Sequence, residues 1–264
     1  MTGPAVRSLG QAELEVRPRG AGTGIGRLRT FGCLKLLFPK GNDPLTGVLL
    51  NTSGGVTGGD RLAVSLEVAP GAALALTTQA AERIYRASEG VARTRNRLTV
   101  APGARLDWVP QETILFDGAA LDRRLQAEVA PGGRLFLAEA VVFGRKLSGE
   151  RLDRVTFTDR IQVTRDGVPL LTDATRIDGA DTLARPGVAA GAGAMATLVV
   201  VDEAAAALVA PLRAALGEAG GVSAPRAGLL VARVLAEDGY ALRAALAGAM
   251  SLLAGSPLPP SWRL

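Results

Sequence analysis

Hydrophobic and polar residues alternate in several segments of this chain, with the two-residue period that is typical of β-strands with one buried face. One such segment, residues 155–163, is soon followed by Asp166-Gly167, a dipeptide typical of a tight hairpin turn. Two earlier segments place apolar residues on a single face, and these are Leu62, Val64, Leu66 and Val68, then Leu125, Ala127 and Val129. The pattern predicts a chain built mainly from β-strands.

A seven-residue motif containing Ala-Pro-Gly lies between alternating segments and occurs three times, at intervals of about 30 residues. Pro followed by Gly suits the two central positions of a type II turn, so each copy predicts a strand, a tight turn and a second strand. A repeat of this length predicts stacked, mixed β-sheets that share one core, in a β-solenoid-like arrangement. The copies are Val68-Ala-Pro-Gly-Ala-Ala-Leu74, Val100-Ala-Pro-Gly-Ala-Arg-Leu106 and Val129-Ala-Pro-Gly-Gly-Arg-Leu135; Gln79 and Gln111 follow the first two at the same offset.

The pattern changes late in the chain, where two Ala-rich segments predict α-helices. The first covers residues 203–218, with Asp202 suited to be its N-cap, and the second covers residues 240–253. Between them, residues 229–235 predict a strand and Asp238-Gly239 a turn. Because no linker-like segment interrupts the 264 residues, we expect one mainly β domain over residues 1–264.

The sequence has no histidine and a single cysteine, Cys33, whose role the sequence leaves open. The commonest general base near neutral pH is therefore missing, which excludes Ser-His-Asp and Cys-His nucleophiles. A tight zinc or nickel site is excluded too, since such sites use imidazoles or several thiolates. Any metal handled by this chain must meet oxygen ligands and at most one sulfur.

The formal net charge of +5 raises the question of an acidic partner such as nucleic acid. The basic residues are dispersed, however. The densest cluster, Arg93, Arg95 and Arg97, alternates along a predicted strand and has no aromatic set beside it on which bases could stack. We expect a solvated basic surface and no nucleic-acid partner.

The longest apolar run, residues 187–201, ends at Asp202 and Glu203 and falls short of the ~20 residues that span a bilayer. The first residues are polar and Gly-rich, unlike the charged and then apolar pattern of a secretory leader. We expect no membrane partner and a cytoplasmic location.

The segment Asn51-Thr-Ser-Gly-Gly-Val-Thr-Gly-Gly-Asp60-Arg61 contains glycines at the spacing of a phosphate-binding loop. Such a loop continues with Lys and then Ser or Thr. Here Asp60 and Arg61 follow instead, and a carboxylate at that point repels phosphate. The glycines predict a tight turn with closely packed backbone.

Several acidic residues fall in or next to predicted strands. A carboxylate pair among Glu82, Glu112 and Glu139 could run glycoside hydrolysis on a β-solenoid-like scaffold. The alternative is structural, since buried carboxylates need partners. In that interpretation Glu82, Glu112, Asp117, Glu139 and Glu150 pair with arginines such as Arg83, Arg86 and Arg145.

Three strings together resemble the urease accessory protein family UreD, also called UreH. They are Asn51-Thr-Ser-Gly-Gly-Val-Thr-Gly-Gly-Asp-Arg-Leu62, Thr77-Thr-Gln-Ala-Ala-Glu-Arg-Ile-Tyr-Arg86 and Trp108-Val-Pro-Gln-Glu-Thr-Ile-Leu-Phe-Asp-Gly118. Phe143-Gly-Arg145, Gly149-Glu150 and Arg165-Asp-Gly167 continue the pattern in order, so the resemblance extends from about Lys35 to the C-terminus.

The resemblance implies a β-rich, non-enzymatic scaffold that binds UreF and, with UreF and the GTPase UreG, acts on apo-urease during nickel insertion. It implies no permanently bound cofactor, and nickel only in transit through an internal tunnel. Many family members carry a Cys-His pair shortly before the Gly-Gly motif. Here that region reads Leu45-Thr-Gly-Val48, so the implication does not extend to a strong metal site there.

If nickel passes through this chain, the composition requires a relay of oxygen ligands. The candidates are Asp60, Glu82, Glu112, Glu139 and Glu150. Two rival hypotheses stay open at this point, the carboxylate-pair glycoside hydrolase and a plain protein-interaction module unrelated to nickel.

Overall fold

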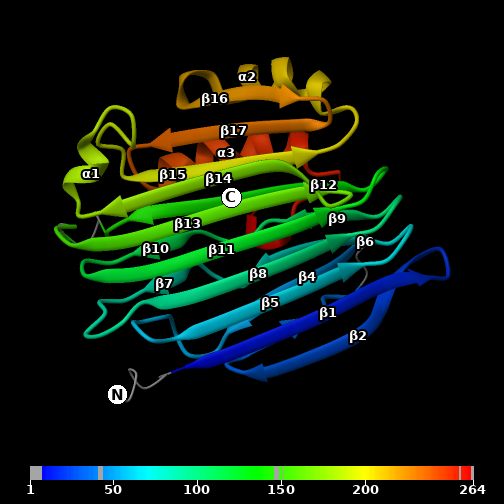
Figure 1. The fold of residues 1–264 in the computed structure, drawn as a ribbon, viewed down its shortest axis with the longest axis horizontal. Coiled ribbons are helices and arrows are strands. Elements are labelled where there is room, and N and C mark those ends of the chain that lie inside the picture. The colour runs from blue at the N-terminus through cyan, green and yellow to red at the C-terminus, as the bar shows by residue number, and fades with distance from the viewer. Residues whose placement is uncertain (1–7, 41–43, 146–148, 151, 256, 263–264) are drawn as a thin grey trace.

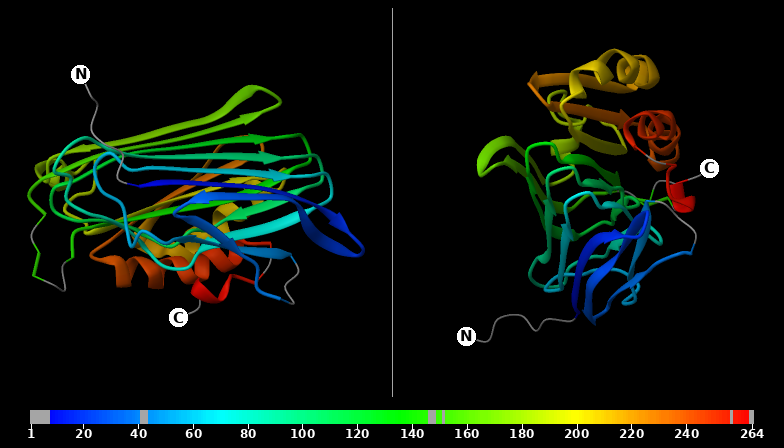
Figure 2. Two further views of the ribbon diagram at one scale, coloured as in Figure 1. Left: turned by 90° about the horizontal axis from the view of Figure 1, so that it is seen from below. Right: turned by 90° about the vertical axis from the view of Figure 1, so that its right-hand side faces the viewer.

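The computed structural model describes residues 8–40, 44–145, 149–150, 152–255 and 257–262, which form two large β-sheets that face one another. The two longer helices lie beside the second sheet, and within the described ranges no helix covers the outer face of the first (Figure 1 and Figure 2). The chain is thus mainly β with helices near its C-terminal end, as predicted.

The first sheet has seven strands, of which the central five are parallel and each edge strand belongs to an antiparallel hairpin. One of these hairpins turns at Asp166 and Gly167, both with positive φ, as the sequence predicted. In spatial order the strands are β14 (Val168–Asp178), β13 (Val155–Arg165), β11 (Ala119–Val129), β8 (Ala92–Val100), β5 (Arg61–Val68), β1 (Leu9–Arg19) and β2 (Gly22–Gly32).

The second sheet has ten strands and combines a parallel centre with antiparallel edges. Its main path runs through β16 (Gly220–Arg226), β17 (Leu229–Ala236), β15 (Ala194–Val201), β12 (Arg134–Phe143), β9 (Arg105–Trp108), β6 (Ala73–Thr78), β4 (Leu45–Asn51) and β3 (Leu34–Leu37). Two short strands lie off this path: β10 (Thr113–Leu115) pairs with β12, and β7 (Glu82–Ile84) pairs with β10.

The three Ala-Pro-Gly turns carry the chain from the first sheet to the second. They join β5 to β6, β8 to β9 and β11 to β12, and their glycines Gly71, Gly103 and Gly132 all have positive φ. A bond of 3.0 Å from Ala72 N to the carbonyl of Ala69 closes the first turn. Strands before the turns are parallel neighbours in one sheet, and strands after them are parallel neighbours in the other. The β-solenoid-like repetition is therefore confirmed.

A third, short side connects the two sheets in each layer. Val56 bridges to Ile84 in a parallel pairing, and β7, β10 and the end of β12 continue this column. Gln79 and Gln111 take equivalent places, after β6 and after β9, as their equal offsets in the sequence indicated. Residues about one repeat apart consequently lie side by side.

The main core lies between the two sheets and is formed by inward residues of the alternating strands, such as Leu66, Leu98 and Leu125. A second core lies on the other face of the ten-stranded sheet, where helices cover β12, β15 and β17. Every residue of β15 is therefore buried, since the strand has apolar neighbours on both faces.

Both predicted late helices are present. The first is broken into a 3-10 turn, Ala205–Leu208, the α-helix α2, Val209–Leu216, and a second 3-10 turn, Gly217–Ala219. Proline lacks an N–H and is tolerated only in the first turn of a helix, so Pro211 fixes the late start of α2. Asp202, predicted as the N-cap, accepts a hydrogen bond from Ala204 N just before the 3-10 turn, whose own N-cap position, Ala204, has no side-chain cap.

The second helix, α3, spans Gly239–Leu253. Asp238-Gly239 was predicted as a turn, and the structure shows that Asp238 is the helix N-cap, because its carboxylate accepts a bond of 2.9 Å from Ala241 N. A four-residue helix, α1 (Asp181–Ala184), was not predicted. No helix in the described part of the chain is long and apolar enough to cross a bilayer.

Candidate functional site

A cavity of about 260 Å³ lies between the sheets, beside the short third side. Strands of both sheets contribute side chains to it, and the exposed residues Gln79 and Ala80 line it as well, so it reaches the surface at that loop. Its polar lining is unusual for the space between two apolar sheet faces. The polar residues are Asn51, Thr78, Gln79, Glu82, Arg83, Thr94, Asn96, Gln111, Thr113, Arg123 and Glu139.

Glu82, at the start of β7, is the carboxylate of this cavity that has no cationic partner among the described residues. Both of its oxygens accept hydrogen bonds from the Asn51 side-chain amide, at 3.1 Å each. Burial raises the pKa of the Glu82 carboxyl to about 7; the Asn51 bond opposes the shift, and the nearby charge of Asp60 adds to it. Glu82 therefore changes charge near neutral pH.

Three polar residues occupy inward positions on adjacent strands of the seven-stranded sheet. Thr94 on β8, Arg123 on β11 and Asp159 on β13 share one register. Arg123 forms two parallel hydrogen bonds to the Asp159 carboxylate, at 2.9 and 2.7 Å. The Thr94 hydroxyl is buried and has no hydrogen-bond partner among the described residues. A hydroxyl in this position can bond to whatever the cavity holds.

Glu139 faces this row from β12 of the other sheet. One of its oxygens accepts a bond of 2.8 Å from the indole N–H of Trp108, and the other lies 2.5 Å from an Arg123 nitrogen. Burial raises the pKa of the Glu139 carboxyl, and the Arg123 charge opposes that shift. Glu139 and Arg123 thus join the two sheets through one buried ion pair.

Asp60 lies next to the cavity and does not line it. Its carboxylate accepts bonds from Ser8 N at 2.8 Å and Thr57 N at 2.9 Å, which ties the glycine-rich segment to the start of β1. The tight turn predicted there is confirmed, since Gly55 has positive φ and a Cβ on it would meet the Tyr85 ring at 2.4 Å. Asp60 is therefore held by backbone donors.

Glu112 and Glu150 lie outside the cavity lining. Glu112 forms an ion pair of 3.0 Å with Arg243 of α3. Glu150 pairs with Arg145 at 3.0 Å, and that hydrogen bond holds the pKa of the Glu150 carboxyl below its usual range. Of the five relay candidates, the structure brings Glu82 and Glu139 to the cavity and leaves Asp60 beside it.

The structural interpretation of the carboxylates holds for part of the set. Glu112, Asp117, Glu139 and Glu150 pair with arginines. Two of these pairs use arginines named from the sequence: Asp117 pairs with Arg86 at 2.5 Å, and Glu150 pairs with Arg145. Asp60 and Glu82 have no arginine partner among the described residues, so pairing does not account for them.

The chemistry available in the cavity is that of neutral oxygen donors and two carboxylates, one of them bound to Arg123. A cation can be attracted there by ionised Glu82 and contacted by amide and hydroxyl oxygens. No group of three or more His, Cys, Asp or Glu residues in the described part of the chain could hold a metal ion. The arrangement suits loose, exchanging contact better than storage.

Sequence reasoning missed Arg123, Asp159 and Trp108 as members of this site. A signal for the first two was available: each occupies an inward position in an otherwise apolar alternation. Trp108 is buried, and its indole N–H also fixes Glu139. Charged residues on an apolar strand face mark a polar interior site.

Comparison with known proteins places the chain in a family. The family model described as "UreD urease accessory protein" matches residues 8–263. A urease accessory protein UreD of Ruegeria pomeroyi is 48% identical over 96% of this chain and 100% of its own length. Those of Roseobacter denitrificans and Brucella suis are 43% and 42% identical over 98% and 100% of this chain, and over 96% and 97% of their own.

These matches cover nearly the whole chain, so they extend the resemblance noted in its three strings to its full length. The chain belongs to the UreD family of urease accessory proteins.

Proposed function

We propose that this chain is a scaffold that binds UreF, and through it UreG, on apo-urease and supports nickel insertion into the urease active site. Its family gives it a role in urease maturation. The observation that carries the proposal is the match over residues 8–263, since it includes every element that forms the cavity and the late helices. The partners and the nickel step are the proposed part.

The glycine-rich segment supports a division of labour in which another protein hydrolyses the nucleotide. Its backbone is packed tightly: a Cβ on Gly58 would lie 2.0 Å from the carbonyl oxygen of Glu89. The Asp60 carboxylate accepts hydrogen bonds from two nearby backbone N–H groups, those of Ser8 and Thr57. A phosphate finds neither space nor free donors of that kind there.

The late helices support protein binding. Tyr240 at the start of α3 is 78% exposed and Leu252 near its end is 45% exposed, although α3 buries its other face against the ten-stranded sheet. Both side chains are candidates for contact with a partner protein. This face is the part of the surface that we assign to UreF.

The cavity supports transient contact with nickel in transit, with Glu82 as its ionisable oxygen ligand. Oxygen ligands match nickel poorly beside imidazole or thiolate, so they release it readily. Glu139 is held by Arg123 and Trp108, and we assign it a positioning part in the same route. No permanently bound cofactor is proposed.

Complementation tests the function most simply. In a host that carries the urease genes but lacks its own member of this family, the chain should restore urease activity and co-purify with UreF, UreG and apo-urease. A chain that restores neither contradicts the proposal. The hydrolase alternative predicts activity against a glycan panel that is lost on Glu112→Gln, and a plain interaction module predicts neither result.

A further inference from the structure

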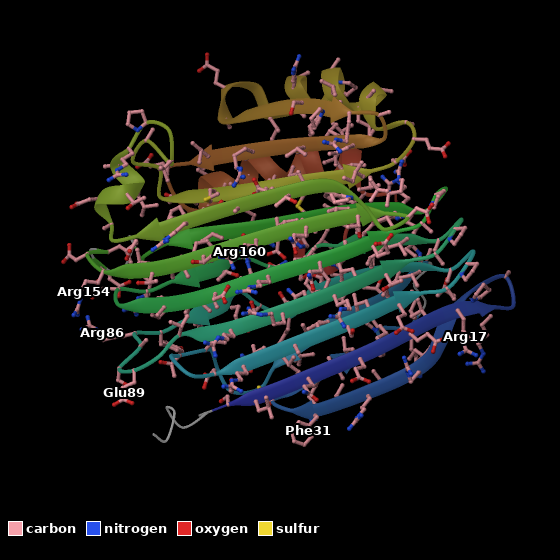
Figure 3. All side chains as sticks on the ribbon, in the orientation of Figure 1. Arg17, Phe31, Arg86, Glu89, Arg154 and Arg160 are labelled. Carbon is pink, nitrogen blue, oxygen red and sulfur yellow. The ribbon has the colours of Figure 1, made fainter. Side chains whose placement is uncertain are left out.

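The outer face of the seven-stranded sheet carries a cluster of arginines, which we call the arginine face. Figure 1 views the molecule onto this face, and Arg160 lies near its middle (Figure 3). Because side chains alternate between the two faces of a strand, these arginines point away from the cavity described above. They are Arg61, Arg93, Arg95, Arg97, Arg124 and Arg160.

The register of the strands places like charges directly beside one another. Arg95 on β8, Arg124 on β11 and Arg160 on β13 are paired in sequence across three neighbouring strands. Arg61 of β5 is the direct neighbour of Arg93. Like charges opposite each other on adjacent strands are destabilising, so this arrangement costs the isolated fold stability.

Internal partners compensate only part of this charge. Arg95 pairs with Asp122 at 2.6 Å, and Arg124 reaches the same carboxylate at 3.3 Å. The remaining four form no ion pair with any described residue, and these are Arg61, Arg93, Arg97 and Arg160. A surface that served only to keep the protein soluble would intersperse positive and negative side chains.

Three carboxylates on the same face, those of Glu15, Glu67 and Glu128, lie at the turn end and have their own partners, whereas Asp122 and Glu13 lie nearer the arginines. Glu15 and Glu67 are register neighbours there, and each contacts an arginine, Arg17 and Arg27 respectively. Glu128 accepts bonds from Thr164 and from the backbone of Gly167. The face thus has a compensated acidic end and a basic middle that Asp122 compensates only in part.

The basic middle is also hollowed. A depression of about 570 Å³ is lined by four of the arginines together with the short side chains of Ala63 and Ser65 on β5. Gln126 and Gln162, which bond to each other at 3.2 Å, form its floor beside them. Guanidinium and amide groups together provide forked donors for carboxylates.

We propose that the arginine face is a docking surface for a partner protein that presents a cluster of Asp and Glu side chains. Charge complementarity supplies the argument: an acidic protein surface would compensate the four unpaired arginines and remove the repulsion between neighbouring strands. This inference is separate from the proposed function, because it concerns the sheet face opposite to the cavity and helices.

A protein fits this face better than a nucleic acid does. Asp122 lies among the arginines and Glu13 lines the depression, so a continuous phosphate backbone would meet carboxylates. No aromatic residue lines the depression, whereas binding of unpaired bases relies on aromatic stacking. A folded partner can place neutral or basic groups opposite these acids and opposite the acidic end.

The test measures binding of a fluorescent poly-glutamate peptide to the purified full chain by anisotropy. Arg97→Gln/Arg124→Gln/Arg160→Gln should weaken binding at least about tenfold. The control Arg19→Gln/Arg154→Gln/Arg185→Gln removes three exposed arginines elsewhere and should retain the wild-type affinity. All six side chains are exposed, so both variants should fold, and the first should unfold no lower than wild type because it removes neighbouring like charges.

Three results would overturn the proposal. The first is wild-type protein that does not bind the peptide. The second is equal weakening in both variants, which would make net charge the cause. The third is tighter binding of a single-stranded oligonucleotide or of phosphatidylglycerol vesicles than of the peptide, which would assign the face to a nucleic acid or a membrane surface instead.

Discussion

The guanidinium group of Arg123 lies 2.5 Å from the carboxylate of Glu139, and the two residues belong to opposite sheets. Each is almost fully buried, and Asp159 neutralises the remaining side of Arg123. A layered β fold of this kind normally fills the space between its sheets with apolar side chains. Here the ion pair of Arg123 and Glu139 spans the space between the sheets at the wall of the cavity.

Replacing Arg123 should therefore destabilise the fold strongly. Arg123→Met leaves two buried carboxylates without their cation, and we expect a loss on the order of 3–5 kcal/mol in the free energy of unfolding. Arg27→Met is the matched control, since the Arg27–Glu67 pair is exposed and worth at most about 1 kcal/mol. Urea denaturation compares the two variants, and equal losses would contradict the account.

The raised pKa of Glu82 predicts a pH dependence of stability. Because the folded state holds this proton up to about pH 7, whereas the ordinary value is 4.5, the associated stability is complete below the ordinary value. It is lost as the pH rises through 7, and the full loss amounts to about 3 kcal/mol.

Glu82→Gln removes this titration, so its stability relative to wild type should increase between pH 5 and pH 8. Glu203→Gln changes an exposed carboxylate and should show no such trend. Denaturation at several pH values decides between them. If the difference in stability between Glu82→Gln and wild type is the same at every pH, the pKa of Glu82 is not raised in the folded state.

Much of the layered fold could be predicted from the sequence, because the alternation and the Ala-Pro-Gly turns are local signals. The alternation does not say whether the strands beside a turn pair with each other or enter different sheets, since both arrangements bury the same residues. The late start of α2 depends on Pro211, whereas the Ala-rich composition alone predicted one helix over residues 203–218.

The site was less predictable, because its contacts join residues about one repeat apart. Asn51 and Glu82, and likewise Trp108 and Glu139, are separated by 31 residues in the sequence and touch across neighbouring layers. The repeat length contained that information. The contact between Arg123 and Glu139 across the cavity did not follow from the repeat length. Which residues of the two sheets face each other depends on the length of every connecting segment.

The exposed side of α3 predicts poor solubility of the chain alone and rescue by co-expression with UreF. Leu252→Glu should retain the fold, since the side chain is partly exposed, but should co-purify with less UreF. Val168→Glu alters an exposed apolar residue on β14 and should leave co-purification unchanged. A monodisperse monomer that is stable without UreF would count against this assignment.

Nickel binding by the purified chain should be weak and without a defined stoichiometry. The available ligands are carboxylate, amide and carbonyl oxygens, and burial raises the pKa of the single thiol, Cys33, which disfavours the thiolate. Isothermal calorimetry measures this directly. Tight, stoichiometric binding that survives Cys33→Ala would be incompatible with the composition of the cavity.

The most direct test of the proposed nickel route is the nickel content of urease matured with shape-preserving variants. Glu82→Gln removes the ionisable oxygen ligand and keeps the size and shape of the side chain, and Asp60→Asn and Glu139→Gln are made beside it.

For each variant, the amount of complex with UreF and UreG and the nickel bound per urease are measured in the same cells. We predict that Glu82→Gln forms the complex in wild-type amount and yields urease with less nickel. If every variant that lowers the nickel content also loses the complex, the carboxylates are structural and the route through the cavity is contradicted.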